Sequence, residues 1–129
     1  AKLSMKHALK DHTEIAFVNA HGTSTPVGDE IEYNAIKQIL GNVPIVSNKS
    51  KIGHTMGACG IIEAIYTIMS LKSGTMPDNH NITNCSFDNN GLVTSKDRTI
   101  TGTKALNNSF GFGGKCASQL IEIVKHADN

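Results

Sequence analysis

Apolar positions in the first half of the chain form short continuous runs separated by longer stripes with helical spacing. Mostly apolar runs predict buried strands over residues 14–20 and 44–47. Between them, apolar residues recur with helical spacing from Gly28 or Asp29 to about Leu40. The residues expected on the buried stripe of that helix are Ile31, Ala35, Ile36, Ile39 and Leu40. A further helix over 57–71 is apolar nearly all round, which predicts a buried central element.

The second half of the chain is expected to contain a long loop followed by two strands. Residues 72–90 are rich in Asn, which predicts an irregular surface loop that runs into 92–94. Strands are expected over 104–110 and 116–124, joined by the glycine-rich turn 111–114. The later part of the last strand alternates between apolar and polar residues, which favours antiparallel pairing across that turn.

The order strand–helix–strand–helix–loop–strand–strand predicts an α/β fold. We expect a mixed, mostly parallel sheet with a closing antiparallel strand and with helices packed on it. A length of 129 residues suits one domain, spanning 1–129. Residues 1–10 add a helix with no capping residue or initiator Met before it. A fragment of a longer protein and a whole protein with a frayed first helix both fit this beginning.

Charge and cysteine content narrow the function classes. Twelve Lys and Arg residues against eleven Asp and Glu give a net charge of +1, which offers no electrostatic basis for binding nucleic acid or an anionic membrane. No apolar run approaches the length of a membrane span. Cys59, Cys85 and Cys116 are odd in number and widely spaced. They indicate reduced thiols in a cytosol-like compartment and argue against a disulfide scaffold or a zinc site.

Three polar loops follow predicted strands and carry side chains capable of chemistry. Ligands of α/β sheets bind beyond the carboxyl ends of the strands, so the loops at His21, 49–54 and 111–114 are expected to converge. His21 can donate or accept a proton near neutral pH, although a histidine at a strand exit is more often structural. His54 precedes the apolar helix, where positive partial charge favours a neutral imidazole. A helix-capping role fits His54 equally well.

Two further features bear on a site in these loops. Glu63 lies within the otherwise apolar helix, and burying a carboxylate costs several kcal/mol unless it is paired. Lys49 or Lys51, a bound cation or several hydrogen-bond donors would meet that need, whereas a position on the rim of the helix would need none. The glycine-rich turn has backbone N–H groups that can donate to an oxyanion, although a tight hairpin explains it as well.

Taken together, three segments resemble signatures of the β-ketoacyl-acyl carrier protein synthases, in the order and spacing of that family. They are VNAHGTSTPVGD at 18–29, NKSKIGHTMGACGIIEA at 48–64 and NSFGFGG at 108–114. HGTSTPVGD and the later GLVTSKDRTI favour the synthase I branch, while synthase II and polyketide ketosynthases stay open. The initiating synthase III resembles the chain less, because it uses His and Asn in place of two histidines.

The resemblance implies a thiolase fold, built from two similar α/β halves, of which this chain matches the C-terminal one. The nucleophilic cysteine of such enzymes lies in the N-terminal half, and none of Cys59, Cys85 and Cys116 matches its position. Two departures from the family pattern stand out. Lys115-Cys116 replaces the usual Thr-Asn after GFGG, and Asn48 replaces a small or hydroxyl residue. Neither departure affects a residue that the resemblance places in catalysis.

The resemblance also implies roles for individual residues. His21 and His54 match two active-site histidines that donate hydrogen bonds to the malonyl thioester oxygen, and Lys49 and Glu63 match a pair that orients them. The backbone N–H of Phe112 matches half of an oxyanion hole. The residues matched to substrate binding are Thr23, Thr25, Phe110 and Phe112. The residues matched to a structural cation seen in some members are Asn19, Glu32, Glu63 and Asn108.

The implied activity is an acyltransferase reaction of fatty-acid synthesis: the decarboxylative Claisen condensation of malonyl-carrier protein with an acyl-enzyme. Acyl carrier protein and the N-terminal half are the implied partners, in a cytoplasmic homodimer. No cofactor is required beyond the phosphopantetheine arm that the carrier protein brings. The 129 residues alone are expected to be inactive and to expose an apolar face. A non-catalytic chain-length-factor-like subunit and a polyketide ketosynthase domain are the alternatives.

Overall fold

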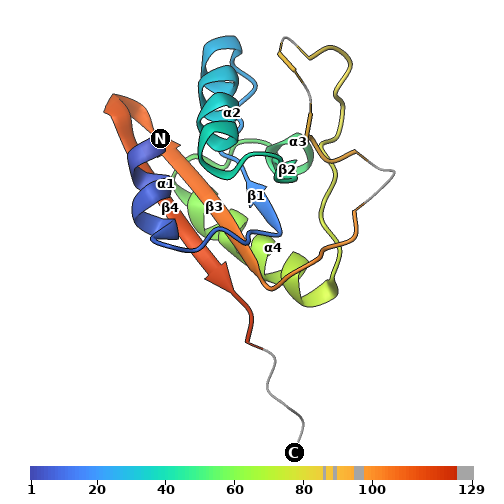
Figure 1. Ribbon diagram of the computed structural model, residues 1–129. Coiled ribbons are helices and arrows are strands. Elements are labelled where there is room, and N and C mark those ends of the chain that lie inside the picture. The colour runs from blue at the N-terminus through green and yellow to red at the C-terminus, as the bar shows by residue number, and fades with distance from the viewer. Residues whose placement is uncertain (86, 89, 95–97, 125–129) are drawn as a thin grey trace, which may run out of the picture.

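A four-stranded sheet forms the middle layer of the computed structural model, which describes residues 1–85, 87, 88, 90–94 and 98–124 (Figure 1). The strands lie in the order β2-β1-β3-β4. Their bounds are Phe17–Asn19 for β1, Ile45–Val46 for β2, Lys104–Gly111 for β3 and Lys115–Glu122 for β4. β1 pairs in parallel with β2 and β3, and β3 pairs antiparallel with β4. The expected mixed, mostly parallel sheet with a closing antiparallel strand is therefore confirmed.

Helices cover both faces of this sheet. Their bounds are Lys2–Leu9 for α1, Pro26–Leu40 for α2, Lys49–Ile52 for α3 and Cys59–Ser73 for α4, with 3-10 turns η1 at Met56–Ala58 and η2 at Phe112–Gly114. None of the helices in the described part of the chain is long and apolar enough to cross a membrane.

Alternation along the strands sorts the core into two clusters. Val18 pairs with Ile45 on one side and Leu106 on the other, and these side chains pack with α1 and α2. Phe17 and its partner Ala105 point to the opposite face, where they pack with Leu71 of α4 and with Val46. Successive side chains of a strand face opposite sides, so one sheet supports two apolar layers.

Several expectations are corrected by the structure. The segment 49–54, expected as a loop, contains the short helix α3. The first long helix begins at Pro26, two residues before the earliest predicted start; proline suits the first helical turn, where its missing N–H costs nothing. Ile31, expected in the buried stripe, is 58% exposed. The segment 92–94, into which the predicted loop runs, is joined to β2 by a parallel bridge between Leu92 and Ile45.

The apolar helix also differs from expectation. It starts as the turn η1 and continues as α4, and only part of its circumference is buried. The residues of α4 that are both apolar and exposed are Ile61, Ile65, Tyr66, Ile68 and Met69. The prediction of an element buried on all sides is therefore wrong for this chain, while the exposed apolar face expected from the resemblance is present.

Candidate functional site

Two histidines from separate loops meet beyond the carboxyl ends of β1 and β2. His21 follows β1 by two residues, and His54 lies between α3 and η1. Their ring centroids are 5.5 Å apart, and the rings meet edge to face at 87°. The Phe110 ring of β3 lies 5.7 Å from His21 on another side. Parallel pairing of β1 with its neighbours directs all three segments to the same edge of the sheet.

The partners of the two rings determine which nitrogen carries the proton. The Lys49 ammonium lies 3.3 Å from Nδ1 of His21, and an ammonium can only donate. The backbone N–H of Met56 donates to Nδ1 of His54 at 3.1 Å. Each Nδ1 is thus the acceptor, and each neutral ring carries its proton on Nε2. In each ring Nδ1 accepts a hydrogen bond, so Nε2–H is the group that can donate to a ligand.

Burial keeps His21 neutral. Loss of solvent, with smaller contributions from the charges of Lys49 and His54, lowers the pKa of His21 to about 4. At neutral pH the His21 ring is therefore an uncharged hydrogen-bond donor. Such a group can stabilise a developing negative charge without giving up its proton to it.

Lys49 links this ring to the apolar helix. Its ammonium donates to Oε1 of Glu63, and the side chains of Lys49 and Glu63 are 5% and 0% exposed. The carboxylate of Glu63 is therefore paired with a cation, as we expected because an unpaired buried carboxylate would cost several kcal/mol. Its second oxygen, Oε2, has no hydrogen-bond partner among the described residues.

Glu32 holds the backbone of the loop that contains His21. Its two carboxylate oxygens accept the backbone N–H groups of His21 at 2.9 Å and Gly22 at 3.0 Å. The amide of Asn108 on β3 donates to the same carboxylate at 3.0 Å. Burial raises the pKa of Glu32, opposed by these donors. The charged hydrogen bonds of a carboxylate to backbone N–H groups hold the loop in one conformation.

The cation implied by the resemblance fits the four matched residues only in part. Glu32 and Asn108 are hydrogen-bonded to each other, and Oδ1 of Asn108 also accepts from Ser118. Oδ1 of Asn19 and Oε2 of Glu63 are the two buried side-chain oxygens of this set that lack a partner in the described part of the chain. Hard cations take six or more oxygen ligands, so two free oxygens fall short of a site.

A cavity of about 650 Å³ opens beside His54. It is lined by Lys49, His54 and the threonines matched to substrate binding, Thr23 and Thr25, whose hydroxyls are 3.4 Å apart. Asp29 also lines it and accepts the backbone N–H of Ser24 at 3.1 Å. Burial raises the pKa of Asp29, opposed by N–H donors of this loop. The hydroxyls thus lie in a concave space that His54 also lines.

Phe112 is placed apart from the histidine pair. It begins η2 and its side chain is 87% exposed, so the contact with His21 is made by Phe110 instead. Gly113 and Gly114 in the same turn have φ of 74° and 77°, a region that favours glycine. Within the described part of the chain, the Phe112 side chain is therefore not packed against other residues.

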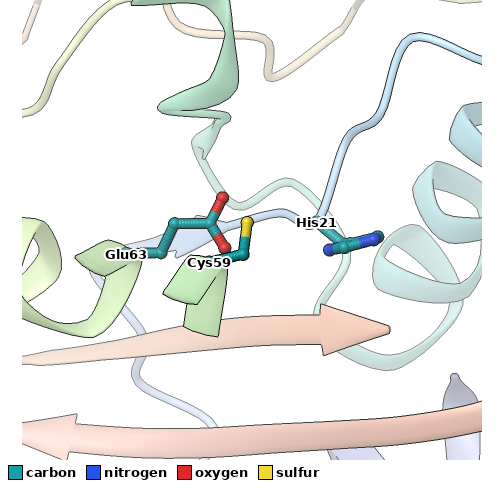
Figure 2. Close-up of side chains that lie close together, drawn as sticks. All are labelled: His21, Cys59 and Glu63. Carbon is teal, nitrogen blue, oxygen red and sulfur yellow. The ribbon is translucent and has the colours of Figure 1, made fainter. Parts of the chain in front are cut away.

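Sequence reasoning missed Thr67, Asn107 and Cys59 as residues of the site. The side chain of Asn19 donates to Thr67 at 3.2 Å and to Asn107 at 3.1 Å, forming a buried polar network beneath the site. Cys59, which the sequence did not place in the site, lies beside His21 and Glu63 (Figure 2). The four-residue spacing of Cys59 and Glu63 on one helix face was the available signal.

Comparison with known proteins gives consistent matches. Residues 1–83 match the family described as "Beta-ketoacyl synthase, C-terminal domain". The mitochondrial 3-oxoacyl-[acyl-carrier-protein] synthase of Arabidopsis thaliana is 37% identical over 136 residues, covering 96% of this chain and 30% of that protein. The chain thus spans about a third or less of such relatives.

Solved structures agree with this similarity. The crystal structure of a β-ketoacyl synthase from Burkholderia phymatum STM815 superposes with a TM-score of 0.85 at 36% identity, covering 96% of this chain and 32% of the other. The ishigamide ketosynthase/chain length factor structure superposes with a TM-score of 0.82 at 28% identity, covering 94% and 32%. The α/β arrangement expected from the sequence is therefore that of thiolase-fold ketosynthases.

Proposed function

Because this chain belongs to the family of β-ketoacyl synthase C-terminal domains, we propose that it forms part of a 3-oxoacyl-[acyl-carrier-protein] synthase of fatty-acid elongation. The reaction would be the decarboxylative Claisen condensation of malonyl-carrier protein with an acyl-enzyme. The observation that carries the proposal is the pairing of His21 and His54, with ring centroids 5.5 Å apart and both Nδ1 atoms accepting hydrogen bonds.

The chemistry of the proposed step needs neutral donors at one oxygen. When malonyl thioester loses carbon dioxide, the electron pair of the broken C–C bond moves into an enolate, and negative charge develops on the thioester oxygen. Nε2–H groups of His21 and His54 would donate to that oxygen. The low pKa of His21 supports this role, because a charged imidazolium would protonate the enolate and end the reaction.

The residues around the pair have supporting roles in this proposal. Lys49 holds Nδ1 of His21 and is itself fixed by Glu63, and Glu32 fixes the His21 backbone. Thr23 and Thr25 would bind the phosphopantetheine arm in the cavity that they line with His54. The backbone N–H of Phe112 would supply half of an oxyanion hole, and Phe110 and Phe112 would border the acyl chain.

The proposal extends to groups beyond these 129 residues. The acyl group would be carried by a cysteine in the part of the longer relatives that this chain does not match. Acyl carrier protein and that other half would be its partners, in a cytoplasmic homodimer that needs no cofactor apart from phosphopantetheine. The isolated chain would then be inactive. No step of the proposal depends on a bound cation.

A chain-length-factor-like subunit is the non-catalytic alternative, and a polyketide ketosynthase domain is a catalytic one. The ishigamide ketosynthase/chain length factor structure is similar to this chain, so fold alone does not separate these functions. A subunit without chemistry has no need for two neutral donors beside a buried Lys–Glu pair. The presence of His21, Lys49 and His54 in one site favours the catalytic function.

The test is the His54→Ala substitution in the longer synthase that contains this chain. Loss of one donor to a developing oxyanion costs roughly 100- to 1,000-fold in rate, so condensation should fall by at least about 100-fold. His7→Ala on the exposed face of α1 is the matched control and should leave condensation unchanged. Unimpaired condensation by the His54→Ala variant would exclude the proposed role of His54.

A further inference from the structure

The turn from β2 into α3 is held by one side chain that comes 32 positions after Ser47. Oδ1 of Asn79 accepts the backbone N–H of Ser47 at 2.7 Å. Nδ2 of Asn79 donates to the carbonyl oxygens of Ile45 at 2.8 Å and Val93 at 3.2 Å. The reverse orientation of this amide would place its nitrogen against an N–H group and its oxygen against two carbonyls. Asn79 thus uses both of its N–H donors and its oxygen on backbone groups at the end of β2.

The residue after Asn79 ties the same loop to α3. The backbone N–H of His80 donates to Oγ of Ser50 at 3.0 Å, and the Ser50 hydroxyl donates to the carbonyl oxygen of Ser47 at 3.0 Å. The N–H of Ser47 is therefore held by Asn79, and its carbonyl is held by Ser50. These contacts fix the point where the chain leaves β2 and enters α3.

The side chain of Ser47 connects this turn to the loop that contains His21. The Ser47 hydroxyl donates to the carbonyl oxygen of Gly22 at 3.2 Å. A Cβ atom on Gly22 would lie 2.8 Å from Oγ of Ser47, so this close approach needs a glycine, which also suits its φ of 40°. The position of Ser47 therefore sets the spacing between the β2–α3 turn and the His21 loop.

The turn and the loop tied to it form part of the cavity wall. Their residues that line the cavity include Ser47, Ser50, Asn79 and His80. The threonines proposed to bind the phosphopantetheine arm, Thr23 and Thr25, line the same cavity. The hydrogen bonds of Asn79 thus hold a surface of the cavity that the proposed arm would enter.

Other hydrogen bonds hold the groups proposed for chemistry. Glu32 accepts the backbone N–H of His21, and the Lys49 ammonium donates to Glu63. These contacts do not involve the Asn79 amide. Loss of that amide should therefore disturb the cavity wall more than the orientation of the His21 ring.

We propose that Asn79 is a positioning residue, which holds this wall of the cavity in the arrangement that receives the phosphopantetheine arm. The inference rests on the proposed function, because that function places the arm in this cavity. A wall that is already ordered binds its ligand without the free-energy cost of ordering a loop. Without Asn79 the Ser47 N–H loses its acceptor, and the turn can adopt arrangements that do not fit the arm.

The kinetic test uses Asn79→Ala and the isosteric Asn79→Asp in the longer synthase that contains this chain. Asp keeps an acceptor for the Ser47 N–H but turns a carboxylate oxygen towards the carbonyls of Ile45 and Val93. In both variants KM for malonyl-carrier protein should rise about tenfold, if the wall takes the binding arrangement about a tenth of the time. The value of kcat should stay unchanged, as for a loss of binding shared by substrate and transition state.

Asn42 provides the matched control, because it is an exposed asparagine shortly before β2. Asn42→Ala and Asn42→Asp should leave both KM and kcat unchanged. An unchanged KM in either Asn79 variant, or a loss confined to kcat, would overturn the inference. Condensation by the unmodified synthase would still support the proposed function in that case.

Hydrogen exchange on the 129-residue chain gives a readout that does not depend on turnover. Asn79→Ala should accelerate exchange at the amides of Ser47 and His80 by at least about tenfold, because local opening of the turn exposes them. The amide of Ala20, which donates to Val46 at 2.7 Å, should exchange as in the unmodified chain. Unchanged exchange at Ser47, or equal acceleration at Ala20, would overturn the positioning role of Asn79. These amides test that role even if the synthase fails to condense.

Discussion

The Lys49 ammonium and the Glu63 carboxylate form an ion pair whose side chains are 5% and 0% exposed. Fourteen positions separate the two residues along the chain, and α3 and α4 bring them together. Desolvation makes such a pair a modest contributor to net stability, but removal of one partner leaves an uncompensated buried charge. The pair therefore connects the integrity of the fold to the orientation of His21.

Substitution Lys49→Met should destabilise the chain by about 3–5 kcal/mol, because Glu63 would remain buried without a countercharge. Urea unfolding of the 129-residue chain measures this directly. Lys51→Met is the matched control, since Lys51 is 39% exposed and its pair with Asp78 should contribute less than about 1 kcal/mol. Equal losses in the two variants would contradict the assignment of a buried charge at Glu63.

Acid should destabilise the fold through His21. The folded-state pKa of about 4 lies below the ordinary value of 6.5, so the unfolded chain binds more protons between these two pH values. His21 thus has no effect on the free energy of unfolding above about pH 6.5, and stability falls as pH decreases from 6.5 towards 4. Below that window both states are protonated and the decline from this group ends.

His21→Gln should flatten this part of the pH profile, measured as the free energy of unfolding between pH 4 and 7. His7→Gln on exposed α1 should leave the profile as it is in the unmodified chain. A ring-proton titration of His21 by NMR with a midpoint near 6.5 would refute the neutral donor that the proposed mechanism requires.

Glu32→Leu should destabilise the chain and loosen the His21 loop. The substitution leaves the backbone N–H groups of His21 and Gly22 without their acceptor, at about 1–3 kcal/mol each, or roughly 2–6 kcal/mol together. Hydrogen exchange at these two amides should accelerate along with the loss of stability. Glu30→Leu, at an exposed position of the same helix, is the control. Equal rates of exchange at the His21 and Gly22 amides in the two variants would argue against the role of the Glu32 carboxylate as their acceptor.

The exposed apolar stripe of α4 should make the chain self-associate. Ile61, Ile65 and Met69 recur every four residues and are 64%, 49% and 59% exposed. Ile65→Lys should lower the apparent mass in light scattering over a concentration series, because it places a charge in the middle of the stripe. Val27→Lys adds the same charge on α2, where the side chain is 69% exposed, and should have little effect. A strictly monomeric unmodified chain would contradict this prediction.

The sequence by itself determined the order of the strands and of the longer helices, the antiparallel closing pair and the family signatures. These properties are local: alternation in β4 and helical spacing in α2 depend on residues a few positions apart. Convergence of His21 and His54 also followed from the sequence, because parallel strands deliver their carboxyl ends to one edge. The resemblance also predicted that Glu63 is a site residue paired with Lys49, and not an ordinary polar position of the helix.

Only the tertiary structure decided which groups meet around these histidines. That Glu32 holds the His21 backbone, and that Cys59 lies beside His21, depends on contacts between segments far apart in the chain. The sequence also did not reveal that Ile31 and one face of α4 are exposed. Apolar character alone does not show whether another element covers a residue. Packing across the sheet sets these distances, and no local pattern of residue types encodes them.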